Sequence, residues 1–150
     1  MIEILVVVGV LGIALVTLTQ VIQLSFRLSH IANDRVEAVY LAREGMEALR
    51  YLRDDSWTRY IAPLSTTTIY HLSFNGSRYA TTTTAPALIN KKFQRQFTTA
   101  SVFRDSNDNI AGSGTADTST VQLTMKVLWQ VGTVSSTESI IFYLTNLFQN

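Results

Sequence analysis

The feature that most constrains this chain is an uncharged run near its start, because no charged side chain occurs between Glu3 and Arg27. At 1.5 Å per residue, a helix from Ile4 to Phe26 is roughly 34 Å long, enough to cross a hydrocarbon core of about 30 Å. From Ile4 to Leu18 the run is apolar on every side, so it lacks the polar face of a helix that lies on a membrane surface. The sequence therefore predicts a membrane-spanning helix.

A cleavable secretory signal is the alternative explanation for such a run. A signal needs a basic segment before a shorter apolar core and a small-residue cleavage site after it. Here no Lys or Arg precedes the run, and no A-x-A pattern follows it. We therefore expect the helix to be retained as an anchor.

Glu3 is an acidic residue at the start of this predicted span. A carboxylate deep in a membrane is unfavourable by roughly 3 kcal/mol. In the headgroup region, in the first turn of the helix, the same carboxylate would complement the helix dipole. Taken alone, Glu3 is best explained by that headgroup position.

The order of residues from Ile2 to Ile13 resembles the conserved start of the type IV pilins and the type II secretion pseudopilins. In that family the mature chain begins with Phe and has a glutamate as its fifth residue, so Met1, Ile2 and Glu3 match the third, fourth and fifth places. The segment Tyr40–Arg50 also looks like the corresponding part of many minor pilins. The resemblance implies that Glu3 serves inter-subunit assembly, and that the membrane and filament-core helix includes Ile4, Leu5, Val6, Val7, Val8, Gly9, Leu11 and Gly12.

This resemblance implies a structural subunit, a minor pilin or pseudopilin, and no enzyme activity. The subunit would span the cell (inner) membrane once, with its C-terminal domain outside the cytoplasm, and would be extracellular after assembly into a pilus. The implied partners are other pilin subunits through helix packing, a pilus or secretion assembly platform, membrane lipid, and prepilin peptidase for the full-length precursor. In the family the glutamate pairs with the N-terminal amine of a neighbouring subunit, and Glu3 would take that role.

The sequence departs from the family pattern at its start. The short basic leader that ends in Gly, and the Phe that follows the cut, do not precede Met1, so we expect either an internal start codon or a trimmed chain. A basic leader ending in Gly and then Phe, encoded in the DNA upstream of Met1, would distinguish a pilin from an anchored domain of another kind. Many family members also carry a proline midway along this helix, whereas the stretch from Leu15 to Leu24 has none.

Helical signals continue from Arg27 to Trp57, which contains neither proline nor a turn cluster. Apolar or small residues recur there at steps of three and four, which predicts one buried helix face. Asp54-Asp55-Ser56 ends the pattern. We expect four-residue ion pairs between Arg43 and Glu47 and between Arg50 and Asp54. The predicted buried face consists of Ala38, Leu41, Ala42, Gly45, Ala48, Leu49 and Leu52.

The remaining residues show strand and turn patterns. We expect strands over 69–74, 77–80, 93–104, 121–131 and 139–144, with Asn75-Gly76 as a type I′ hairpin turn and Gly132 in the last connection. Phe97 and Phe103 are expected on one face of their strand. The fold class is therefore α+β, with an antiparallel sheet packed on the second half of the long helix. The expected segments are 1–26 in the membrane or filament core, 27–57 as an amphipathic helix, and 58–150 as the sheet domain.

No grouping of residues predicts catalysis, and we expect no cofactor and no metal site. The chain has no cysteine, which excludes disulfides and thiolate sites. His30 and His71 have no partner at metal-ligand or triad spacing, so surface or packing roles are expected. Asp105, Asn107 and Asn109 suggest a calcium loop, but the EF-hand pattern fails two of its positions, and a polar turn explains the same residues.

The charge pattern gives little support for nucleic-acid binding, since the net charge is +1. Lys91, Lys92 and Arg95 form a single short basic cluster, with Phe93 and Phe97 interleaved. We interpret it as a solvated edge and do not expect DNA binding.

The alternative function is a single-span membrane-anchored binding domain that does not polymerise. Such a protein would not require Glu3 and would not be processed by prepilin peptidase. The sequence does not distinguish a pilus from a secretion or competence system, and it names no ligand.

Overall fold

The computed structural model describes residues 1–147 of the 150-residue chain, without the Leu5 side chain. The chain divides into two compact units, Met1–Val36 and Glu37–Asn150. Its described elements are α1 (Ile2–Asp55), α2 (Trp57–Tyr60), β1 (His71–Phe74), β2 (Tyr79–Thr82), β3 (Gln94–Arg104), β4 (Ile110–Ala111), β5 (Thr115–Val131) and β6 (Val134–Thr145).

The long helix α1 ends at Asp55, within the acidic cluster that the sequence marks as its end. Ser56 then caps the short helix α2, because its side-chain oxygen accepts a hydrogen bond from the Arg59 backbone N–H at 3.4 Å. The helical segment expected to reach residue 57 is thus divided between two helices.

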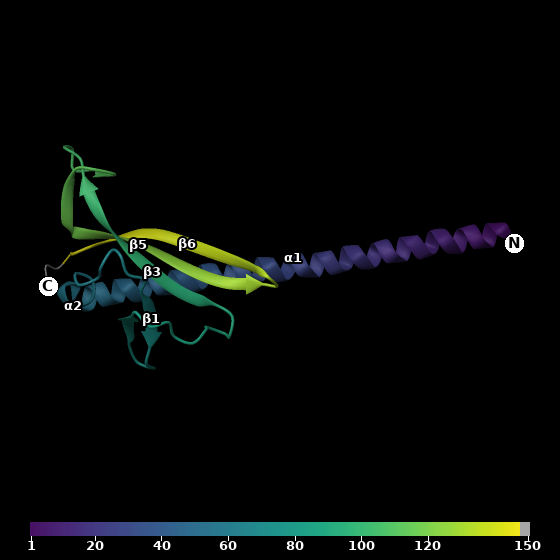
Figure 1. Cartoon of the computed structure of the whole chain (residues 1–150), viewed down its shortest axis with the longest axis horizontal. Coiled ribbons are helices and arrows are strands. Elements are labelled where there is room, and N and C mark those ends of the chain that lie inside the picture. Colours follow the sequence, from purple (N-terminus) through teal and green to yellow (C-terminus); the bar gives the residue numbers. More distant parts are fainter. Residues whose placement is uncertain (148–150) are drawn as a thin grey trace. The chain divides into compact units, whose positions relative to one another are not determined.

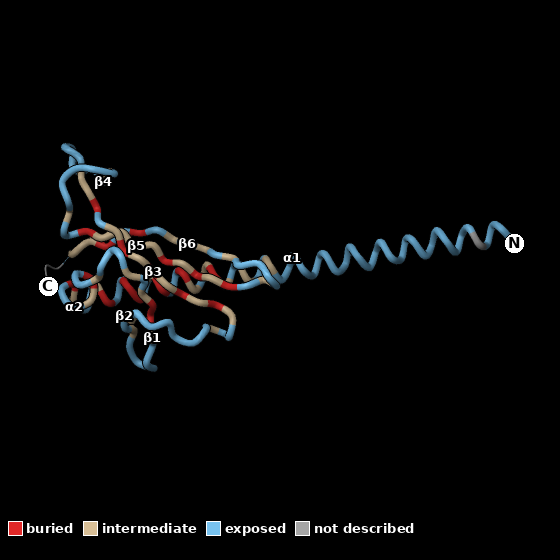
Figure 2. The backbone as a smooth tube through the Cα atoms, in the orientation of Figure 1, coloured by how far each residue is buried: buried red, intermediate tan, exposed pale blue. Residues whose placement is uncertain are grey.

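The α+β prediction is confirmed in the Glu37–Asn150 unit, where the later part of α1 packs on an antiparallel sheet (Figure 1). The strand order is β4-β3-β5-β6. The predicted helix face is buried apart from Leu41, which is half-buried. Figure 2 shows buried residues gathered on the sheet and on the later part of α1. The largest fully buried side chains are Phe93, Phe97, Leu49, Leu52, Leu123, Met125, Leu144 and Val127.

At Gly45 the helix comes close to the sheet. A Cβ atom at this residue would lie 2.8 Å from Met125 Cε and 2.9 Å from Arg95 Cδ. Only a residue without a side chain leaves Met125 and Arg95 in place, so Gly45 allows this close approach.

The last hairpin agrees with the alternating pattern in the sequence. β6 pairs along its whole length with residues 120–131 of β5, as far as Val131 opposite Val134. Gly132 lies in the two-residue connection with φ +64°. Both strands are longer than expected, because β5 begins at Thr115 and β6 at Val134. The added residues are mostly polar, so they show no alternation of apolar and polar side chains from which a strand could be predicted.

The prediction of a type I′ turn at Asn75-Gly76 is wrong. Phe74 pairs with Tyr79, so the loop has four residues, and the return strand begins at Tyr79. The Asn75 side-chain oxygen accepts hydrogen bonds from the backbone N–H groups of Ser77 at 3.0 Å and Arg78 at 2.8 Å. This side-chain capping organises a longer turn than the dipeptide alone predicts.

The prediction that Phe97 and Phe103 share a face is also wrong, because β3 is irregular between Ser101 and Val102. Ser101 pairs with Val121, whereas Val102 pairs with Asp117, so residues 118–120 of β5 are left over. The irregularity reverses the alternation: Val102 is buried and Phe103 is only half-buried. We call the part beyond it, formed by residues 102–117, the arm; it includes β4, within the segment expected to be a loop.

The ion pairs predicted on α1 between residues four positions apart are replaced by pairs between residues nearer in sequence. Arg50 Nη1 lies 2.7 Å from Glu47 Oε1, three residues away. Arg53 Nε lies 2.8 Å from Oδ1 of the adjacent Asp54. These pairs are exposed or partly exposed, so each contributes little to stability.

Two carboxylates in the arm accept strong hydrogen bonds. Arg104 Nε donates to Asp117 Oδ2 at 2.7 Å, and this bond, with one from Thr120, holds the pKa of Asp117 below its usual value. Asp105 Oδ1 accepts the backbone N–H groups of Asn109 and Asn107 at 2.9 and 2.8 Å, which lowers the pKa of Asp105.

The lowered pKa of Asp117 predicts loss of stability in acid. A free aspartate carboxyl group binds a proton near pH 3.9, whereas the folded Asp117 does so only at lower pH. Its contribution to the free energy of unfolding is therefore complete above the unfolded pKa and is lost as pH falls through the folded pKa. Asp117→Asn cannot titrate. We expect its urea midpoint to fall less between about pH 6 and about pH 3 than that of the wild type. An equal fall in both proteins would contradict this assignment.

Candidate membrane and assembly segment

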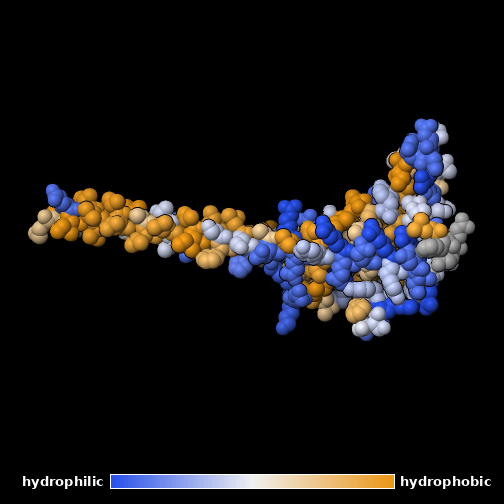
Figure 3. All heavy atoms as spheres, turned by 180° about the vertical axis from the view of Figure 1, so that it is seen from behind, coloured by the Kyte–Doolittle hydropathy of each residue, from blue (hydrophilic) through white to orange (hydrophobic). Residues whose placement is uncertain are grey.

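The first part of α1 carries the predicted membrane and assembly residues. Glu3 lies in the first turn, where a carboxylate complements the helix dipole. The apolar side chains that follow are exposed, for example 69% for Ile4 and 57% for Leu11. Leu5 belongs to the same helix by its backbone, and its side chain lies outside the described residues. Figure 3 shows this segment as a mostly hydrophobic surface.

Among the described residues, α1 is the one helix long and apolar enough to cross a membrane. No residue in the most apolar stretch of this helix is buried within the protein. Because apolar side chains exposed on all sides are unfavourable in water, an apolar environment such as a membrane is more favourable for this segment.

The polar groups of the segment differ in how they are satisfied. Thr17 Oγ1 donates to the Ile13 carbonyl at 2.9 Å, and Thr19 Oγ1 donates to the Val16 carbonyl at 2.8 Å. Within the described residues, the amides of Gln20 and Gln23 have no hydrogen-bond partner. Thr17 and Thr19 are therefore compatible with an apolar environment as they stand, whereas the two amides are not.

Gly9 and Gly12 lie on the same exposed stretch. A Cβ atom at either position would have no neighbour within 4 Å among the described residues, so neither glycine is needed for packing against them. Small residues in a span let another helix backbone approach closely.

Comparisons of this chain with protein-family models, with curated proteins and with solved structures give no match.

The predicted basic cluster in the other unit does not form one surface. Arg95 is only 6% exposed; its Nη1 donates to the Leu41 carbonyl at 3.0 Å and lies 3.3 Å from Glu44 Oε1. Tyr79 donates a hydrogen bond to the same Glu44 carboxylate, and burial together with Glu44 raises the pKa of Tyr79. The interpretation of Arg95 as part of a solvated edge is wrong, because its strand alternation turns it toward α1.

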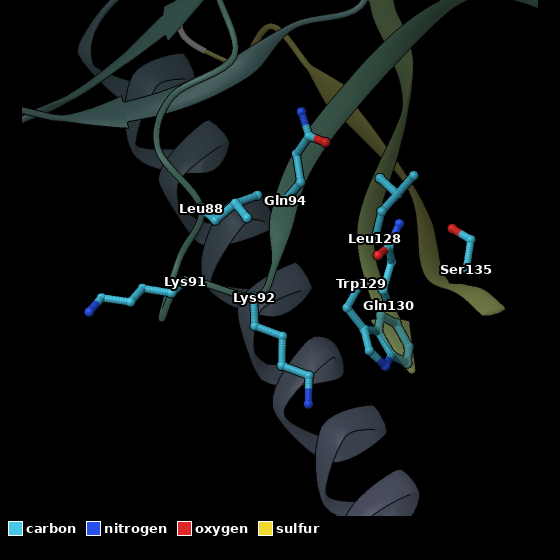
Figure 4. Close-up of a pocket in the computed structure, with 8 residues that line it drawn as sticks. All are labelled: Leu88, Lys91, Lys92, Gln94, Leu128, Trp129, Gln130 and Ser135. Carbon is cyan, nitrogen blue, oxygen red and sulfur yellow. The ribbon is translucent and has the colours of Figure 1, made fainter. Parts of the chain in front are cut away.

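Lys91 and Lys92 line an open depression of about 450 Å³ and extend in different directions (Figure 4). Its other lining residues are Leu88, Gln94, Leu128, Trp129, Gln130 and Ser135. The Trp129 indole N–H is buried and has no hydrogen-bond partner among the described residues. These lining residues combine two lysines, amides, a hydroxyl and apolar groups, and include no His, Asp, Glu, Cys or Tyr side chain.

The two histidines and the Asx-rich loop have structural explanations. His71 is buried, with Nδ1 3.1 Å from the Arg95 carbonyl, and His30 is exposed on α1. Asp105 organises its loop through the backbone hydrogen bonds described above, as a polar turn does. Across residues 1–147, no three His, Cys, Asp or Glu residues are grouped so that they could hold a metal ion.

Proposed function

We propose that this chain is a structural subunit, of the minor-pilin kind, of a type IV pilus or of a type II secretion-like pseudopilus. The observation that carries the proposal is an exposed helix with Glu3 in its first turn, followed by an uncharged apolar surface. The similarity of Ile2–Ile13 to the start of the pilins supports the same function.

The proposed mechanism begins with the subunit in a membrane. The apolar side chains after Glu3 are then surrounded by lipid. An assembly platform moves the helix into a bundle of subunits, where contacts between helices replace those with lipid. Since lipid is as apolar as the side chains, this exchange depends on close packing and on polar contacts between helices. Gly9 and Gly12 provide room for the packing.

Glu3 provides the polar contact in this proposal. Inside a bundle of apolar helices its carboxylate requires a partner, and the pilin resemblance assigns that part to the N-terminal amine of a neighbouring subunit. Removing one member of a buried ion pair costs about 3 kcal/mol or more. Each 1.4 kcal/mol corresponds to a factor of ten.

The test is Glu3→Ala in the full-length gene product, expressed beside the wild-type subunit. We expect membrane insertion to be unchanged, because the apolar run is intact, and incorporation into filaments to fall about a hundredfold. Quantitative immunoblots of membrane and sheared-filament fractions measure both quantities.

The matched control is Glu47→Ala, which removes another exposed carboxylate of α1 at 61% side-chain exposure. It should assemble like the wild type. Normal incorporation of Glu3→Ala, or the absence of this subunit from any filament fraction, would favour the non-polymerising anchored domain instead.

A further inference from the structure

Polar residues form a row along one side of α1 in the Met1–Val36 unit. Gln20, Gln23, Arg27, His30 and Asp34 are separated by alternating steps of three and four residues. At 100° per residue they fall within an arc of about 80° of the helix circumference. We call these five residues the polar row. Figure 3 shows paler and blue surface interrupting the hydrophobic surface toward the middle of α1.

The row begins inside the predicted span. Gln20 and Gln23 belong to the last turns of the uncharged run and have no hydrogen-bond partner within the described residues. Glutamine amides in a span are stabilised when they bond to polar groups of another helix. Val21 and Ile22, at the same depth on other sides, are apolar and about half exposed. Among these four neighbouring positions, the need for a polar partner therefore lies on the side of Gln20 and Gln23.

The charges of the row are complementary to a displaced copy of the same row. Arg27 and Asp34 are seven residues apart. A parallel copy shifted by seven residues, about 10.5 Å along the helix, brings its Arg27 to the height of Asp34. The same shift places Gln20 beside Arg27 and Gln23 beside His30. A copy shifted by three or four residues also places some polar residues side by side, but it does not bring Arg27 to Asp34.

We propose that the polar row is the face through which α1 binds α1 of a second copy of this chain, in parallel and displaced by seven residues. This inference rests on the proposed filament function and specifies which side of the helix faces the other copies. Copies arranged around one axis can all turn the row toward that axis, so several rows meet there. Asp34 also has a polar interaction within its own chain, and its two carboxylate oxygens accept more than one donor.

The other sides of the helix are less suited to this contact. Ser25, Ser29 and Asn33 form a second row, but it is uncharged and therefore fixes no register. The remaining side chains at this level are mostly apolar and are equally satisfied by lipid or by packing.

Disulfide trapping tests the face and the register together, because the natural chain has no cysteine. Gln23→Cys with His30→Cys places two thiols seven residues apart on the row and keeps Arg27 and Asp34. Two such residues of one helix are about 10.5 Å apart, too far for a disulfide within the chain. We expect oxidation of assembled full-length protein to give a ladder of cross-linked multimers.

The matched control is Ile22→Cys with Ser29→Cys, which has the same spacing on another side of the helix. We expect several-fold less cross-linking from this pair. The single variants Gln23→Cys and His30→Cys should give little, because the shift separates identical residues.

Charge exchange tests the ion pair separately. Arg27→Asp alone and Asp34→Arg alone place like charges together in the displaced contact, so we expect assembly to fall at least about tenfold. The double variant Arg27→Asp with Asp34→Arg should recover assembly, since it restores opposite charges.

The outcomes separate this inference from the function on which it rests. A ladder from the Ile22/Ser29 pair but not from the Gln23/His30 pair, or no recovery in the double charge variant, would overturn the polar row while filament assembly remained. Failure of every pair to cross-link, in a protein that also forms no filaments, would overturn the proposed function itself.

Discussion

Gly45→Leu is expected to lower the free energy of unfolding of the Glu37–Asn150 unit by about 3 kcal/mol or more. The reason is the close approach of α1 to the sheet, where even a Cβ atom would lie 2.8 Å from Met125 Cε. A leucine side chain must displace both Met125 and Arg95, and Met125 is fully buried. Such a loss is a large share of the roughly 5–15 kcal/mol that stabilises a domain.

Urea unfolding followed by tryptophan fluorescence measures this effect, because both tryptophans, Trp57 and Trp129, are buried in that unit. Gly12→Leu is the matched control in the same helix, since a Cβ atom there meets nothing within 4 Å, and its midpoint should not change. Gly45→Ala should change stability by less than about 1 kcal/mol, because alanine's higher helix propensity offsets the displacement of flexible side-chain atoms. A Gly45→Leu midpoint equal to the wild type would show that the contact is not tight.

Arg95→Ala is expected to destabilise the same unit by about 3 kcal/mol. The substitution leaves a cavity where a side chain of 6% exposure stood, and it leaves the Leu41 carbonyl without its 3.0 Å donor. The Glu44 carboxylate also loses the cation 3.3 Å away.

Arg95→Met distinguishes the packing of this side chain from its charge. Methionine keeps most of the apolar stem and removes the Nε group, which is buried without a partner. Because Glu44 is 48% exposed at its side chain, water can solvate the carboxylate when the cation is gone. We expect a loss of about 1 kcal/mol or less, in line with buried ion pairs replaced by apolar residues. Equal losses in both variants would mean that the charge, and not the packing, stabilises this site.

The long helix and the strand from Val121 to Val131 were predictable because the spacing of apolar residues within each segment shows its periodicity. The buried face of α1 from Ala38 to Leu52 follows from steps of three and four, and the pattern from Val121 to Val131 follows from steps of two. The strand extensions were not predictable, since Thr115–Thr120 and Val134–Glu138 are mostly polar and pair through backbone groups that every residue has.

The candidate site was partly predictable for the same reason. Glu3 and the exposed apolar run are local features of the sequence, and the spacing of Gln20, Gln23, Arg27, His30 and Asp34 was also available in it. That spacing becomes informative only with two structural facts: the helix is continuous through these residues, and the two amides have no partner in the part of the chain that the structure describes.

The sequence by itself determined the long helix, its apolar first part and the α+β class, because each depends on the periodicity or length of a continuous segment. Only the tertiary structure decided where Arg95 and Phe103 point and why residue 45 must be small. Arg95 and Phe103 depend on strand register and on the irregularity after Ser101, and Gly45 depends on Met125, eighty positions away in the chain. Contacts between residues so far apart in sequence depend on how the side chains pack, and a pattern in neighbouring residues does not reveal them.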